Sequence, residues 1–129
     1  QYGQNVTDDE PLRRIPPLFG GLTITFDDWR QRKLGRRASY YWRASMEWNF
    51  AAKQGRLAAG DKSDNRITTG GTAGWQVVNI YARWNISVKG AYLILKPGIW
   101  NIFNTDYRYH GSGVNGLGRS ATLGGAVVF

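Results

Sequence analysis

The side chains best suited to hold a ligand gather near the end of the chain, in the run Tyr107, Arg108, Tyr109 and His110. Arginine pairs with carboxylate and phosphate groups, and tyrosine rings stack on other aromatic rings. We therefore expect this run to contact an aromatic or anionic ligand, although the tyrosines would serve equally well as anchors at a membrane interface. His110 is the only histidine, and a single histidine in a loop is more often solvated than a ligand. Arg66, in an earlier polar segment, is a further candidate.

Patterns for other kinds of chemistry are missing. The acidic clusters, Asp8-Asp9-Glu10 and Asp27-Asp28, have no matching base beside them. The glycine pairs near residues 70 and 111 do not lie between a strand and a helix, as a phosphate-binding loop requires. The chain has no cysteine and one histidine, which argues against a zinc site. We expect no catalytic residues, no metal and no cofactor, and we expect that the protein is not an enzyme.

The chain is basic, with 17 lysines and arginines, 9 acidic residues and a net charge of +8 over 129 residues. Such a charge fits three situations: a nucleic-acid-binding surface, contact with anionic lipid or lipopolysaccharide, or basic residues that merely line loops and a wet interior. Composition alone does not choose among them. The sequence also has no apolar run of about 20 residues, the length of a transmembrane helix.

The elements that must position these residues are predicted to be β-strands, because apolar and polar residues alternate. In residues 40–50 every even position is apolar or aromatic and four of the five odd positions are polar, a period of two. Residues 77–86, 120–129 and, more briefly, 22–26 repeat the pattern. We predict five strands, near 18–29, 37–53, 75–88, 89–103 and 117–129. Within the fourth, Lys96-Pro97-Gly98 predicts a kink or bulge, because proline disrupts a strand ladder.

The connections between these strands alternate in length. Segment 53–74 is long and polar, the link at 87–90 is short, and segment 104–118 is long again. Outer-membrane β-barrels have this pattern, with long extracellular loops and short periplasmic turns. The link at 27–39 fits only if its strands run on past the membrane. The strands at 40–50 and 77–86 have the length of about 9–11 residues that a tilted strand needs to cross the hydrocarbon layer.

The predicted fold class is therefore all-β, with about five long antiparallel meander strands that form the C-terminal part of a transmembrane β-barrel. In this fold Arg43, Glu47 and Arg83 point into the lumen. One apolar set of side chains faces lipid: Trp42, Met46, Trp48, Ile80, Trp84, Leu123, Val127 and Phe129. In a soluble domain Trp42, Met46, Trp48, Ile80 and Trp84 would instead form a closed core.

Several runs resemble the carboxy-terminal third of TonB-dependent outer-membrane receptors. Residues 11–20 (PLRRIPPLFG) resemble the proline-rich entry to a late strand. Residues 64–75 resemble an extracellular loop that leads into the next strand, and residues 100–107 (WNIFNTDY) resemble a characteristic strand end. Residues 110–120 resemble the last loop and the opening of the final strand. Phe129, a terminal aromatic residue on an amphipathic strand, resembles the signal by which the barrel-assembly machinery recognises such proteins.

The resemblance implies a receptor in the outer membrane of a Gram-negative bacterium that imports iron-siderophore complexes, haem, cobalamin or similar scarce nutrients. Such receptors have 22 strands and an internal plug. Residues 1–129 would be a C-terminal segment without the plug, and they would contact TonB only through N-terminal parts that the sequence lacks. The implied partners are the remaining barrel and plug, outer-membrane lipid, lipopolysaccharide and the barrel-assembly machinery, with no nucleic acid.

Five strands cannot close such a barrel, so the chain departs from the family in one large respect. We therefore keep two alternatives open. The first is a small basic soluble β-domain that binds nucleic acid or another polyanion. The second is an amyloid-prone fragment whose open sheet edges are never covered.

Overall fold

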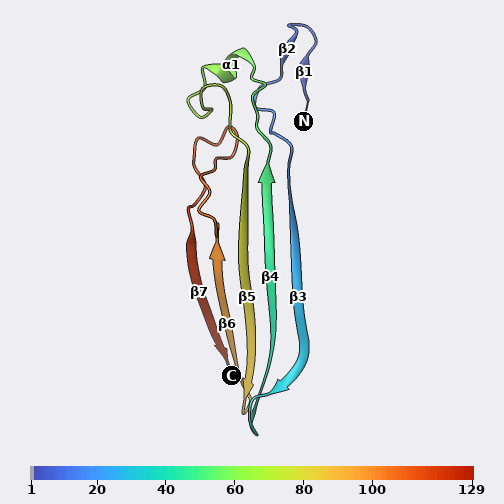
Figure 1. Cartoon of the computed structure of the whole chain (residues 1–129), viewed down its shortest axis with the longest axis vertical. Coiled ribbons are helices and arrows are strands. Elements are labelled where there is room, and N and C mark those ends of the chain that lie inside the picture. Colours follow the sequence, from blue (N-terminus) through green and yellow to red (C-terminus); the bar gives the residue numbers. More distant parts are fainter. Residues whose placement is uncertain (1) are drawn as a thin grey trace.

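The computed structural model describes residues 2–129, and five long strands dominate it (Figure 1). They form one antiparallel meander in which each strand pairs with its neighbours in the sequence. The strands are β3 (Phe19–Lys33), β4 (Ala38–Ala51), β5 (Trp75–Val88), β6 (Ala91–Trp100) and β7 (Ser120–Val128). A two-stranded sheet of β1 (Gln4–Asn5) and β2 (Glu10–Pro11) and the short helix α1 (Ala59–Lys62) complete the fold.

The predicted all-β class and the five meander strands are confirmed. The strand predicted at 75–88 has those bounds, and the strands predicted at 37–53 and 117–129 are each a few residues shorter in the structure. The first strand is longer than predicted, because β3 continues through Asp28 to Lys33. The β1–β2 hairpin and α1 were not predicted; each has only two to four residues per element, too few for a periodic pattern.

The two ends of the sheet differ in their connections (Figure 1). Residues 52–74, residues 101–119 and the β1–β2 hairpin all lie at one end, which we call the loop end. The opposite end, the turn end, has the β3–β4 and β5–β6 turns. Lys89 and Gly90 both have positive φ, 46° and 89°, as a two-residue type I′ hairpin turn requires. The link at 27–39 is likewise short, because β3 and β4 extend to within four residues of each other.

Pairing register separates the side chains of the sheet into two faces. Met46 lies opposite Ile24 on one side and Ile80 on the other, and Ile80 in turn lies opposite Ile99. Because side chains alternate along a strand, one face, the apolar face, is continuous over all five strands. Its large members include Leu22, Ile24, Phe26, Trp42, Met46, Trp48, Ile80, Trp84, Leu95, Ile99, Leu123 and Val127.

The other side of the sheet, the polar face, satisfies its side chains across strands. Arg43 on β4 forms an ion pair with Asp27 on β3. The hydroxyl groups of Thr25 and Ser45 are 3.0 Å apart. Asn79 donates to the Glu47 carboxylate over 3.3 Å. These pairs tie β3, β4 and β5 together, and Ser45 and Asn79 are buried.

Pro97 interrupts a strand ladder without displacing it. Tyr81 pairs with Gly98 and Trp84 pairs with Leu95, so the register between β5 and β6 is the same on both sides of the gap. The ladder between β6 and β7 is unbroken, and Pro97 lies opposite Leu123. The predicted disturbance is therefore a local loss of pairing with β5, since proline has no N–H to donate, and the predicted bulge at this position is wrong. The sheet does have a register shift elsewhere, between Asp28 and Arg32 of β3.

The described residues bury little apolar surface. Within residues 2–129 the buried hydrophobic side chains are Ala51, Ala58, Ile67 and Val77. They belong to the loop end or to the strand ends next to it. By contrast, Ile80 is 43% and Leu123 79% exposed on the apolar face, so no second layer covers this face in residues 2–129. No helix in the described part of the chain is long and apolar enough to cross a membrane.

Candidate functional site

An aromatic cluster at the loop end contains two of the predicted ligand-binding residues. The ring centroid of Trp75, the first residue of β5, lies 4.9 Å from that of Tyr107 and 5.3 Å from that of Tyr109. The two tyrosine rings are 5.7 Å apart and nearly perpendicular, a favourable arrangement for aromatic pairs. The indole Nε1 of Trp75 also donates to the backbone carbonyl of Arg108 over 3.1 Å. Trp75 therefore fixes the last loop against the start of β5.

The last loop keeps its shape through its own hydrogen bonds. The Asn101 side chain donates to the carbonyl groups of Thr105 and Leu117, both over 2.9 Å. The Gly116 N–H donates to the carbonyl of Tyr107 over 2.7 Å. Gly116 lies directly against the Tyr107 ring, where a Cβ atom would overlap the ring. The tyrosines are thus held by a closed loop and packed against Trp75.

His110 binds the neighbouring loop. Its Nδ1 lies 2.9 Å from the hydroxyl of Thr72, which joins residues 101–119 to residues 52–74. Its Nε2 is buried and has no hydrogen-bond partner among residues 2–129. Burial lowers the pKa of His110 below its usual 6.5, and the nearby Asp61 carboxylate opposes this effect. The imidazole is therefore neutral at pH 7.

Two hollows flank Trp75. The larger, of about 620 Å³, is lined by Trp75, Tyr109 and His110 from the loop end and by residues of β3 and β4. Those strand residues include Phe19, Glu47 and Asn49, and Pro16 and Pro17 precede them. The smaller hollow, of about 290 Å³, lies against Tyr107 and Arg108. The structure thus divides the run 107–110 between two hollows that share the Trp75 side chain.

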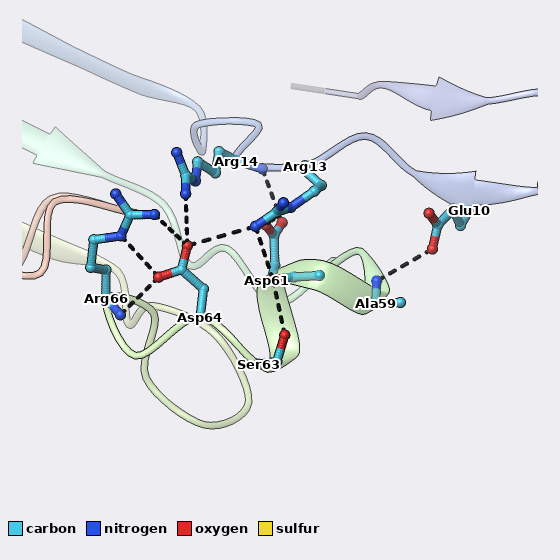
Figure 2. Close-up of polar contacts among 9 residues, drawn as sticks. Glu10, Arg13, Arg14, Ala59, Asp61, Ser63, Asp64 and Arg66 are labelled. Carbon is cyan, nitrogen blue, oxygen red and sulfur yellow. Dashed lines mark hydrogen bonds and ion pairs between the residues drawn. The ribbon is translucent and has the colours of Figure 1, made fainter.

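Arg66 belongs to a separate polar network (Figure 2). Its guanidinium donates twice to the Asp64 carboxylate, over 2.9 and 2.8 Å. Arg14 donates to the same carboxylate over 3.0 Å. The buried Asp61, in α1, accepts the backbone N–H of Arg14 over 2.9 Å and the Nε of Arg13 over 3.4 Å. This network fastens the segment after β2 to α1, and Arg66 does not line either hollow beside Trp75.

The chemistry of the larger hollow follows from its lining. The lining includes one carboxylate, Glu47, and no lysine or arginine, and its histidine is neutral at pH 7. Four aromatic side chains line it: Phe19, Phe50, Trp75 and Tyr109. Such a site suits an aromatic molecule that is neutral or positively charged. Of the two hollows beside Trp75, only the smaller one has an arginine that could pair with an anionic ligand, Arg108.

The residues that β3 and β4 contribute to the lining of the larger hollow were not predicted from the sequence. Trp75 had a usable signal, because it is an aromatic residue at the opening of a predicted strand. Phe19, Glu47 and Asn49 had no such signal, since their approach to the last loop depends on how the loop folds back over the sheet.

Within residues 2–129, no three His, Cys, Asp or Glu side chains lie together as a metal site would require.

The apolar residues predicted to face lipid share one surface. Trp42, Met46, Trp48, Ile80, Trp84, Leu123 and Val127 all lie on the apolar face. Phe129 follows β7 and is fully exposed.

No protein-family model, no curated protein and no solved structure matches this chain.

Proposed function

We propose that the chain is a wall segment of an outer-membrane β-barrel of the TonB-dependent receptor kind, which imports a scarce nutrient such as an iron-siderophore complex. The observation that carries this proposal is the apolar face. It is continuous over five strands and bare of any second layer within residues 2–129, while the reverse face is mostly polar over β3, β4 and β5. Contact between an apolar face and water costs free energy, whereas contact with the hydrocarbon chains of lipid does not.

The direction of the strands supports the same proposal. The long connections and the short turns lie at opposite ends of the sheet (Figure 1), as extracellular loops and periplasmic turns do in these barrels. The apolar stretches of β4 (42–50) and β5 (78–86) each span nine residues. About 9–11 residues of a tilted strand cross the hydrocarbon layer.

Further strands must complete the wall. The outer edges of β3 and β7 have no neighbour within residues 2–129. In lipid each unpaired backbone group costs several kcal/mol, so in the membrane these edges pair with further strands, either those of the rest of the barrel or, for the purified chain, those of other copies. In that arrangement the polar face lines the lumen, which holds the plug and through which the cargo passes.

The hollow beside Trp75 is the cargo contact in this proposal. It opens on the polar face at the loop end, since Glu47 and Asn49 line it together with Tyr109 and His110. Its lining favours an aromatic cargo, and it would hold that cargo by stacking on Trp75 and Tyr109.

Extraction distinguishes this proposal from a soluble polyanion-binding domain. We expect the purified chain to need detergent, to enter phosphatidylcholine vesicles and to resist extraction by carbonate. A chain that stays soluble and monodisperse without detergent would overturn the membrane proposal, because the apolar face would then have to be covered by the protein itself.

A further inference from the structure

The turn end of the sheet has an unusual concentration of positive charge. Six cationic side chains lie in the two turns or in the β3 residues beside them: Arg30, Arg32, Lys33, Arg36, Arg37 and Lys89. All six residues are exposed. In residues 2–129 Asp28 is the only carboxylate within 4.0 Å of any of them, and it pairs with Arg32 over 2.7 Å. The other five have no carboxylate within 4.0 Å among residues 2–129.

The topology brings the two turns together. Ala38 pairs with Val88 and Ser39 pairs with Ser87, so the β3–β4 turn lies beside the β5–β6 turn. Between them is a hollow of about 550 Å³, lined by Lys33, Arg36, Arg37 and the two serines. The hollow thus has three cationic side chains and two hydroxyl groups around it. Side chains of these kinds donate hydrogen bonds to phosphate groups.

The end of the apolar face indicates at which depth in a membrane these cations would lie. Along β3 that face ends at Asp28, which lies opposite Trp42 and pairs with Arg32. Trp29 and Leu34, 76% and 56% exposed, lie among the cations. Tryptophan and arginine together beyond an apolar band are typical of the boundary between hydrocarbon and headgroups.

We propose that the turn end binds the phosphate groups of anionic phospholipid headgroups, and that Arg30, Lys33, Arg36, Arg37 and Lys89 are the residues that attract them. This inference rests on the proposed membrane function and adds the lipid partner of one leaflet. The apolar face places the cluster at headgroup level, where lipid phosphate is the abundant anion. A basic residue near an anionic lipid surface is attracted to it electrostatically.

The test compares vesicles of phosphatidylcholine with vesicles in which one third of the lipid is phosphatidylglycerol. The readout is the partition coefficient of the chain, measured by flotation. The test variant is Arg30→Gln/Arg36→Gln/Arg37→Gln, which leaves the Asp28–Arg32 pair intact. The matched control is Lys53→Gln/Lys62→Gln/Arg119→Gln, which removes three cations near the loop end that form no ion pair in residues 2–129.

We expect phosphatidylglycerol to raise the partition coefficient of the unchanged chain and of the control by about tenfold or more. The test variant should lose most of that gain and still enter phosphatidylcholine vesicles as the unchanged chain does. Equal losses in the test and control variants would overturn the inference, because any basic residue would then suffice.

Two further results separate the inference from the proposal beneath it. If the chain enters both kinds of vesicle equally, the headgroup inference fails and the membrane proposal stands. If the chain enters neither, both fail. Inorganic phosphate, compared with chloride at equal ionic strength, should not displace the chain from phosphatidylglycerol vesicles. Displacement specific to phosphate would overturn the lipid assignment and indicate a site for free phosphate.

Discussion

Trp75 joins three parts of the loop end through one side chain. It begins β5, packs against Tyr107 and Tyr109, and donates to the carbonyl of Arg108. The residue that holds the predicted ligand-binding run in place therefore lies more than 30 positions earlier in the sequence. The run itself was found from residue types alone, but its partner required the fold.

Replacing Trp75 should loosen the last loop. Trp75→Phe keeps a ring but loses the bond to Arg108, and we expect the free energy of local opening of residues 104–118 to fall by about 1 kcal/mol. Trp75→Ala removes the packing as well and should lower it by about 3 kcal/mol. Hydrogen exchange of the loop amides measures both. The control is Phe103→Ala, since Phe103 is 72% exposed; an equal effect there would contradict this role for Trp75.

His110 should make the contact between the two long loops sensitive to acid. Its pKa is lowered in the folded protein, so below pH 6.5 the unfolded state binds more protons than the folded state. The stability of the loop contact is therefore fully present above pH 6.5 and falls as the pH drops towards the folded pKa. Hydrogen exchange of residues 101–119 from pH 8 to pH 5 should show this decline. The variant His110→Gln should show a flatter profile, and identical profiles would exclude His110 as the cause.

At the scale of the elements, the alternating pattern predicted the sheet well and the loops poorly. β4 and β5 alternate between apolar and polar residues through most of their length, so their bounds were predicted within about two residues. The end of β3 was missed because charged residues there resemble a loop, although they pair with β4 after the irregularity beyond Asp28. The division of residues 107–110 between two hollows had no periodic signal, because long-range packing determines it.

The last loop should be intolerant of a side chain at Gly116. A Cβ at this position would overlap the Tyr107 ring, and such overpacking typically costs about 1–3 kcal/mol. We expect Gly116→Ala to lower the local stability of residues 101–119 by that amount, measured by hydrogen exchange. At Gly55 the nearest heavy atom to a new Cβ is 3.6 Å away. Gly55→Ala should therefore change little, and similar losses in both variants would argue against the overlap.

The two faces of the sheet should respond differently to a lysine. Met46 lies at the centre of the apolar face, between Ile24 and Ile80. If that face contacts lipid, Met46→Lys should destabilise the inserted protein by about 2–4 kcal/mol. Thr23→Lys places the same charge on the polar face, opposite Glu47, and should have little effect. Urea unfolding in phosphatidylcholine vesicles measures the difference, and equal effects of the two lysines would contradict the assignment of faces.

For the whole molecule, the sequence predicted a sheet with one apolar and one polar face, and the structure has such a sheet. Within residues 2–129 no part of the protein covers the apolar face. Residues 2–129 place a small hydrophobic core at or beside the loop end, at Ala51, Ala58, Ile67 and Val77, and leave Ile80, Leu123 and their neighbours bare. We propose that lipid covers this bare surface.

Spin-label accessibility tests this central claim most directly. The chain has no cysteine, so single cysteines can be introduced along residues 42–50 and 78–86 and labelled in phosphatidylcholine vesicles. We predict that the labels at even positions, on the apolar face, collide mainly with oxygen dissolved in the lipid, and that those at odd positions collide mainly with a water-soluble nickel chelate. Even positions that are open to the nickel chelate, or a profile without a period of two, would contradict the account.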